Sequence, residues 1–251
     1  MFINLGGVYL YMPYKTIIAK NDYLKRDTMG FCHQFYTGYM TRGNPDFLNI
    51  LKNTFNQELY SNLLTARDRV VGILMKDIPV ILEETGLFNS LVVCVPRAKA
   101  LSYYKPAQLM FLEAVKIAIS CIPCVDDGTD CIIRIKNTKT THIKKQTSIP
   151  NDGPEPYKGI TKDTCKIDKG KIKDRSIILI DDIYTKHVNI DEDCIQALLD
   201  SGAKEVIFYA VGYTIRQILS IDKDFIKAAL RTGEEVIFYS IGDEYVQRRR
   251  I

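Results

Sequence analysis

One stretch of the chain decides its fold: Ile177-Ile178-Leu179-Ile180-Asp181-Asp182-Ile183-Tyr184-Thr185-Lys186-His187-Val188-Asn189. The run from Ser176 to Ile180 is short, apolar and rich in β-branched residues, which is typical of a parallel strand covered on both faces. Asp181 and Asp182 are then expected at the carboxyl end of this strand. Ligands of open α/β sheets bind at that edge, so the acid pair predicts a binding site.

An amphipathic helix is expected directly after this loop. Apolar residues recur at helical spacing from Ile190 until Ser201-Gly202 supplies a stop signal. We expect Asn189 to be the N-cap, with Glu192 completing a variant of the capping box. The free backbone N–H groups of such a helix start attract phosphate oxygens. Residues 205–211 predict another buried strand, so the expected sugar-phosphate site lies inside one right-handed βαβ unit.

The acid pair and its loop resemble the phosphoribosyl pyrophosphate motif of type I phosphoribosyltransferases, in which an apolar strand ends in two acids before a Thr- and Gly-rich loop. The resemblance implies that Asp181 and Asp182 are catalytic residues that hold the ribose hydroxyls, directly or through Mg²⁺. It also implies that the loop binds the 5′-phosphate through Thr185, Lys186, His187, Val188 and Asn189. Thr185 keeps the family's hydroxyl group, whereas the next four residues stand where the family mostly has glycines and small hydroxyl residues.

A second basic segment is expected to complete the site. Residues 91–95 predict a strand, and Pro96-Arg97-Ala98-Lys99 follows it. This segment, with Gln108 downstream, looks most like the pyrophosphate loop of the competence-associated, amidophosphoribosyltransferase-like branch of the same family. The resemblance implies that Arg97 and Lys99 are catalytic and meet the leaving group, since a forked guanidinium and a mobile ammonium both suit a diphosphate. The alternative is an ordinary surface turn after a strand.

A lysine-rich stretch runs from about residue 136 to residue 173. It carries ten lysines, Pro150, Pro154, Pro156 and no sustained hydrophobic period. A long loop of this kind inside a compact domain is usually a lid or disordered. The family resemblance implies a flexible loop that closes over the reacting centre. A nucleic-acid or protein partner that binds these lysines and the basic tail Arg248-Arg249-Arg250 is the competing interpretation.

The predicted fold class is α/β, with a mostly parallel sheet flanked by helices as in type I phosphoribosyltransferases. Residues 89–251 are expected to form this domain. Residues 1–88 match no motif, and the apolar spacing in 47–59 and 63–75 predicts two helices before Pro79 interrupts. We therefore expect an N-terminal, mainly helical addition that acts as a hood over the ligand, an oligomer contact or a partner surface.

The composition is that of a globular protein with a mild positive charge. The chain has 251 residues, 46% of them hydrophobic, and a formal net charge of +4, which suits small anionic ligands as well as polynucleotides. Seven cysteines in mostly apolar surroundings indicate reduced thiols. The sequence has no apolar run of membrane-spanning length, and its start lacks the basic residues of a signal peptide. We expect a cytoplasmic protein that does not bind membranes.

These observations lead to one expected function and two alternatives. The expected function is a phosphoribosyltransferase-like protein that binds phosphoribosyl pyrophosphate, or a ribose phosphate, with Mg²⁺ and transfers or hydrolyses at C1. One alternative is a catalytically silent sensor that keeps the phosphoribosyl site. The other is a nucleic-acid or defence-complex component that reuses the fold.

Overall fold

The structure, a computed structural model of the whole chain, describes residues 2–5, 8–11, 13–41, 43–143, 151–215, 236–241 and 244–249. The chain divides into two units, Met1–Thr214 and Ile215–Ile251. In the second unit, β11 (Val236–Ile241) pairs antiparallel with β12 (Glu244–Arg249). Arg248 and Arg249 of the expected basic tail lie in β12, and Arg250 lies outside the described residues.

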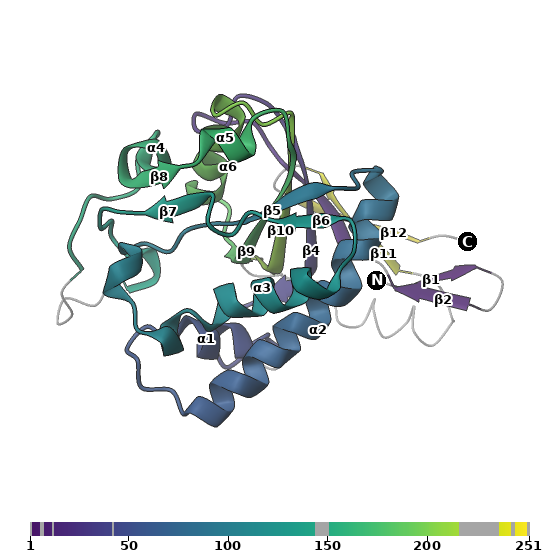
Figure 1. Cartoon of the computed structure of the whole chain (residues 1–251). Coiled ribbons are helices and arrows are strands. Elements are labelled where there is room, and N and C mark those ends of the chain that lie inside the picture. The colour runs from purple at the N-terminus through teal and green to yellow at the C-terminus, as the bar shows by residue number, and fades with distance from the viewer. Residues whose placement is uncertain are drawn as a thin grey trace. The chain divides into compact units, whose positions relative to one another are not determined.

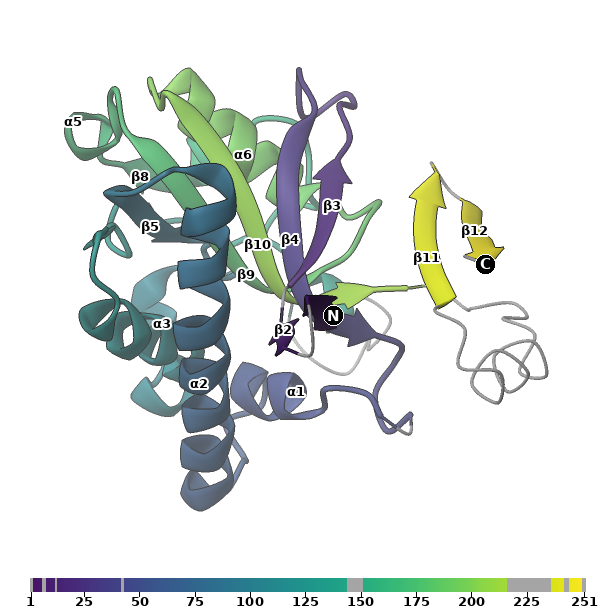
Figure 2. The same ribbon diagram turned by 90° about the vertical axis from the view of Figure 1, so that its right-hand side faces the viewer.

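Within the described part of the first unit, a six-stranded sheet has the order β3-β4-β10-β9-β5-β6. Its strands are β3 (Tyr14–Ile18), β4 (Thr28–Tyr36), β5 (Ser90–Cys94), β6 (Val125–Asp127), β9 (Ser176–Tyr184) and β10 (Glu205–Thr214). All neighbouring strands run parallel except β3, which pairs antiparallel with β4 at one edge (Figure 2). The predicted α/β class with a mostly parallel sheet is therefore confirmed.

Helices cover both faces of this sheet (Figure 1). On one face lie α1 (Phe47–Lys52), α2 (Tyr60–Thr85) and α3 (Met110–Cys121), and on the other lie α5 (Lys169–Ile172) and α6 (Ile190–Asp200). Because successive side chains of a strand point to opposite faces, Ile178 belongs to the first hydrophobic core and Leu179 to the second. Both side chains are fully buried, which explains why the run before the acid pair is continuously apolar.

The first 88 residues are part of the sheet domain and not an addition to it. They contribute β3 and β4, and β4 lies between β3 and β10 in the same sheet as the acid-bearing strand. A separate antiparallel pair is formed by β1 (Phe2–Leu5) and β2 (Val8–Tyr11). The two predicted helices are confirmed as α1 and α2, but α1 ends at Lys52 and does not extend to residue 59.

Helix α2 does not end at Pro79, as the sequence predicted, but runs on to Thr85. A proline inside a helix removes one backbone hydrogen bond and usually breaks or kinks the helix. Here Leu74, Ile78, Ile81 and Leu82 are buried on both sides of the proline, so packing of the two halves against the sheet compensates for the lost bond.

The lysine-rich stretch is not one irregular loop. Its described part contains the single turn η3 (Thr141–Ile143), α4 (Ile160–Thr164), β8 (Cys165–Ile167) and α5. Strand β8 pairs antiparallel with β7 (Ile132–Arg134) in a small separate sheet. The Asp193 carboxylate of α6 accepts hydrogen bonds from the backbone N–H groups of Gly159 and Thr161, which fixes the start of α4. Residues 144–150 of the predicted lid lie outside the described residues.

Candidate functional site

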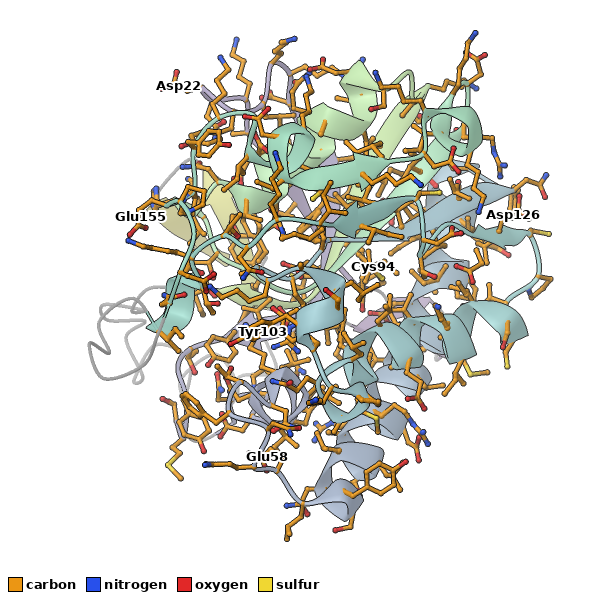
Figure 3. The ribbon with its side chains drawn as sticks, turned by 60° about the vertical axis from the view of Figure 1, so that its left-hand side comes forward. Asp22, Glu58, Cys94, Tyr103, Asp126 and Glu155 are labelled. Atoms are coloured by element: carbon orange, nitrogen blue, oxygen red, sulfur yellow. The ribbon has the colours of Figure 1, made fainter. Side chains whose placement is uncertain are left out.

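A cleft of about 250 Å³ lies where β5 and β9 end. Four parts of the chain that are far apart in sequence line it: the end of α1 with Lys52 and the exposed Phe55 after it, residues of the segment 95–108 including Tyr103 in the turn η1 (Leu101–Tyr103), residues 139–143 of the lysine-rich stretch, and β9 with the start of α6. Tyr103 of this wall is exposed (Figure 3). The N-terminal part of the chain therefore supplies one wall of the cleft.

Six of the predicted site residues line this cleft. They are Arg97, Lys99, Asp181, Asp182, Thr185 and Val188. The other three predicted phosphate-loop residues, Lys186, His187 and Asn189, are not among the lining residues. The structure thus brings the acid pair and the basic segment together, as expected, but only part of the predicted phosphate loop.

The acid pair lies within β9 rather than after it. Pairing of β9 with β5 ends at Ile180, whereas pairing with β10 continues to Tyr184. Asp181 and Asp182 therefore stand on a part of β9 that extends beyond β5 and borders the cleft. The backbone N–H of Asp182 donates to Asp181 Oδ1 at 2.8 Å, and that of Ile183 donates to Asp182 Oδ1 at 2.7 Å.

The two acids differ in their electrostatic surroundings. Burial, followed by the neighbouring charge of Asp182, raises the pKa of Asp181 to about 7, although Lys52 opposes the shift. Lys52 Nζ lies 3.5 Å from Asp182 Oδ1, with both side chains about four-fifths buried. Lys52 has no motif around it in the sequence, and only the long-range contact between α1 and β9 reveals its place at the acid pair.

A third acid, Asp191 in the first turn of α6, also lines the cleft. It is hydrogen-bonded to Asp181, and burial together with the charge of Asp181 raises its own pKa. Its Oδ1 is buried and has no hydrogen-bond partner among the described residues. Its position in the sequence does not distinguish it from Glu192 and Asp193, which lie in the same first turn of α6.

The N-terminus of α6 is correctly placed, but the predicted capping box is wrong. Asn189 is the N-cap with a left-handed φ of 61°, and its side chain makes no capping hydrogen bond. Instead its Oδ1 accepts from Asn21 Nδ2 at 3.1 Å. Glu192 Oε1 accepts from the Tyr184 hydroxyl at 2.8 Å in the core, so it does not reach back to the N-cap. The hydrogen bond from the buried tyrosine thus engages the carboxylate that the capping box would have required.

His187 adopts a backbone conformation that glycine adopts more easily. Its φ is 78°, in the left-handed region, and its side chain is exposed and away from the cleft. Histidine and asparagine adopt this conformation more often than most residues. The loop therefore keeps a left-handed turn without glycine by directing the imidazole into solvent.

Arg97 is tied to the protein backbone. Its Nη1 donates to the Gln108 carbonyl, its Nη2 donates to the Lys52 carbonyl at 2.7 Å, and its guanidinium lies 4.4 Å from the centroid of the Tyr104 ring. The side chain joins the end of α1 to the turn η2 (Pro106–Gln108). In this structure Arg97 thus holds the cleft walls together, which differs from the expected role of meeting a leaving group.

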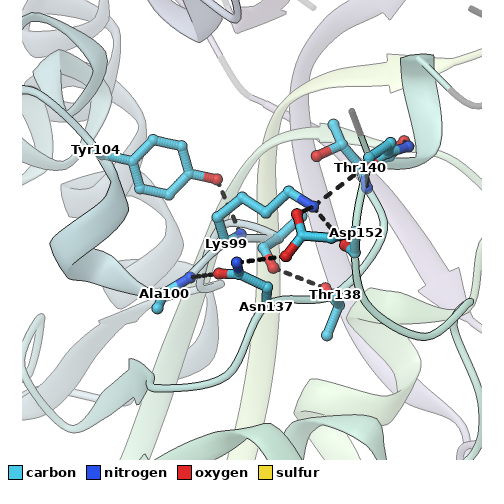
Figure 4. A network of polar contacts seen from close by, with 9 residues as sticks. Lys99, Ala100, Tyr104, Asn137, Thr138, Thr140 and Asp152 are labelled. Carbon is cyan, nitrogen blue, oxygen red and sulfur yellow. Dashed lines mark hydrogen bonds and ion pairs between the residues drawn. The ribbon is translucent and has the colours of Figure 1, made fainter. Parts of the chain in front are cut away.

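Lys99 is also engaged, in a polar network shown in Figure 4. Its side chain is 5% exposed, and its Nζ contacts Asp152 Oδ1 at 2.9 Å, the Asp152 carbonyl at 2.5 Å and Asn151 Oδ1 at 3.4 Å. The backbone N–H and hydroxyl of Thr138 both donate to the Ala98 carbonyl at 2.8 Å. These contacts attach the two ends of the stretch 138–152 to the segment that follows β5.

The donor set suits a magnesium ion only in part. Mg²⁺ binds hard oxygen ligands and usually takes one or two carboxylates together with substrate phosphates and water. Asp181 and Asp182 provide such carboxylates. Among the described residues, however, no group of three or more His, Cys, Asp or Glu side chains has the arrangement needed to hold a metal ion. Protein ligands alone would therefore not complete the coordination.

No protein-family model matches the chain, and no curated protein matches it. In the part of the chain that the structure describes, no helix has both the length and the apolar character needed to cross a membrane.

Proposed function

We propose that this protein is a phosphoribosyltransferase-like protein with a type I phosphoribosyltransferase fold. It would bind phosphoribosyl pyrophosphate, or a ribose phosphate, with Mg²⁺ and transfer or hydrolyse at C1. The observation that carries the proposal is the meeting of two sequence-distant segments in one cleft, the acid pair Asp181-Asp182 and the basic segment that contains Arg97 and Lys99. The cleft also lies at the carboxyl-end edge of the sheet, where open α/β folds bind ligands.

Each element of the cleft has a role in this proposal. Asp181 and Asp182 accept hydrogen bonds from two ribose hydroxyls and so fix the sugar relative to the leaving group. Thr185 and the backbone beside it receive the 5′-phosphate, and Lys52 brings a positive charge to the same cavity. When bound, Mg²⁺ would neutralise part of the diphosphate charge, with Asp181 and Asp182 as its protein ligands.

Arg97 and Lys99 stand beside the position proposed for the leaving diphosphate. A departing diphosphate gains negative charge, which preorganised cations stabilise. Both side chains have protein partners in this structure, so their participation requires that these partners be exchanged for ligand oxygens.

A catalytically silent sensor is the second candidate, and the same contacts favour it. Arg97 donates to two backbone carbonyls, and Lys99 is buried in an ion pair. If Arg97 and Lys99 stay paired with these protein atoms, the site would bind the sugar through Asp181 and Asp182 but would stabilise a leaving diphosphate poorly. Binding without turnover is what this candidate predicts.

Calorimetry with phosphoribosyl pyrophosphate and Mg²⁺, followed by a pyrophosphate-release assay, tests both candidates. Saturable binding with turnover supports the enzyme, and binding without turnover supports the sensor. The double variant Asp181→Asn with Asp182→Asn should lose binding and keep its circular dichroism spectrum. Asp126→Asn with Asp127→Asn is the matched control, because this second aspartate pair lies on β6 and does not line the cleft. Unchanged affinity in the first double variant would refute the site.

A further inference from the structure

The ammonium group of Lys99 has no spare hydrogen-bonding capacity. An ammonium has three N–H donors, and three oxygens surround this one: the carboxylate and the carbonyl of Asp152 and the side-chain oxygen of Asn151. The Lys99 side chain is only 5% exposed, so water does not solvate its charge. The carboxylate of Asp152 therefore neutralises a buried cation at the edge of the cleft.

The carboxylate of Asp152 is fixed by hydrogen bonds, although most of the side chain is exposed to solvent. Its side chain is 60% exposed, and its second carboxylate oxygen accepts from Asn137 Nδ2 at 2.7 Å. Asn137 is itself positioned by the backbone N–H of Ala100, which donates to its Oδ1 at 2.9 Å. The hydrogen bonds from Lys99 and Asn137 hold the pKa of Asp152 below its ordinary value. An ionised, exposed carboxylate thus faces a buried ammonium.

We propose that Asp152 is a specificity-determining residue that occupies the anion position of Lys99 with its own carboxylate. A ligand can form an ion pair with Lys99 only if it carries an anionic group that replaces this carboxylate. The inference rests on the proposed function, because it assigns Lys99 to the diphosphate half of the cleft.

The physical basis is the difference between exchanging an anion and removing one. A phosphoryl oxygen that replaces the Asp152 carboxylate leaves Lys99 paired, and the exposed carboxylate is rehydrated as it leaves. A neutral hydroxyl in the same place would leave a buried cation without a counter-charge, which is strongly unfavourable. The Asp152 carbonyl and Asn151 can keep their contacts with Lys99 during the exchange, so Lys99 has only one hydrogen bond to replace, while the carboxylate also gives up its hydrogen bond from Asn137. The cleft therefore selects diphosphates over neutral sugars.

Removing the charge of Asp152 tests the inference on the full chain. Calorimetry would measure the binding of inorganic pyrophosphate and of phosphoribosyl pyrophosphate, each with Mg²⁺, to the wild type and to Asp152→Asn. The amide is a weaker competitor for Lys99, so we expect both ligands to bind about tenfold more tightly. Asp130→Asn is the matched control, because Asp130 pairs with Lys171 at 2.7 Å, is 58% exposed and does not line the cleft. Its affinities should equal those of the wild type.

The possible outcomes separate the inference from the proposed function. Tighter binding in Asp152→Asn supports the inference, including the case in which the wild type binds too weakly to detect. Wild-type binding that is unchanged or weakened in a folded Asp152→Asn variant overturns the inference and leaves the proposed function in place. Absence of binding in both proteins overturns the two together. Asp152→Glu keeps the negative charge, so it should stay within about threefold of the wild type; if it matched Asp152→Asn instead, charge would not be the cause.

Discussion

Asp191 and Asp181 both line the cleft, and their carboxyl groups are near enough for a hydrogen bond between them to shift the pKa of each. Such a bond can form only while one of the two carboxyl groups is protonated. Burial raises the pKa of both residues, and the pKa of Asp181 reaches about 7. The floor of the cleft therefore changes its charge near neutral pH.

The first prediction concerns stability against pH. The raised pKa values mean that the folded protein keeps protons that the unfolded chain releases between about pH 4 and pH 7, so the free energy of unfolding falls as the pH rises through this window. Asp191→Asn resembles the protonated acid but does not titrate. Urea denaturation should show that the loss between pH 5 and pH 8 is smaller in this variant by about 1 kcal/mol or more.

Asp130→Asn serves as the control for this experiment. Its interaction with Lys171 lowers the pKa of Asp130, so the associated stability is lost only as the pH falls through the acidic range. Between pH 5 and pH 8 its curve should run parallel to that of the wild type. A parallel curve for Asp191→Asn as well would mean that the two buried acids do not share a proton.

The second prediction concerns Lys52. Its positive charge lowers the pKa of Asp181, so Lys52→Met should raise that pKa further above its value of about 7. Carboxyl carbon chemical shifts followed by NMR during a pH titration measure the change. Lys15→Met is the control, because Lys15 pairs with Glu84 at 2.7 Å and does not line the cleft. Equal Asp181 titrations in the two variants would contradict the assignment.

The third prediction concerns the left-handed turn before α6. His187 has a φ of 78°, which glycine adopts without the steric penalty of a side chain. His187→Gly should raise the free energy of unfolding by up to about 1 kcal/mol. Val188→Gly is the neighbouring control, since Val188 does not have a positive φ, and this change should destabilise the protein. A loss of stability in both variants would show that the imidazole makes a stabilising contact.

The fourth prediction concerns Gly153, which has a φ of 101°. A Cβ atom there would lie 2.5 Å from the Asn137 carbonyl oxygen. Gly153→Ala should therefore push the loop at residue 153 away from the segment around Asn137, which takes part in the Lys99 network. Gly159→Ala carries a similar backbone penalty at φ 95° but would meet nothing within 4 Å. We expect Gly153→Ala to destabilise the protein by about 1–3 kcal/mol more than this control. Equal losses would show that the segment around Asn137 moves freely aside.

Local sequence patterns were sufficient to predict β9, but not β3 and β4. The run Ile177–Ile180 is apolar at every position because both faces of β9 are buried. This continuous apolar run was enough to predict the strand. Strand β3 alternates partly buried and exposed residues, and β4 contains Gly30, His33 and Gln34. Neither has a continuous apolar run, and the parallel partner of β4 is β10, more than 170 residues away in sequence. Their place in the sheet depends on this distant pairing.

The sequence predicted those site residues whose position follows from the strand next to them. Asp181, Asp182, Arg97 and Lys99 follow predicted strands, and all four line the cleft. Their partners come from elsewhere: the Lys52 carbonyl for Arg97, and Asp152 for Lys99. No local pattern indicates such contacts, because they depend on how distant loops meet after folding.

The central position of β4 limits how the protein can be shortened. A truncated chain that starts at residue 89 would lack both β3 and β4, and one side of β10 would lose its backbone partners from Phe208 to Thr214. An unprotected strand edge of this kind is a template for intermolecular pairing. Such a fragment would therefore be expected to aggregate, even though it retains every aspartate, arginine and lysine by which the site was first recognised.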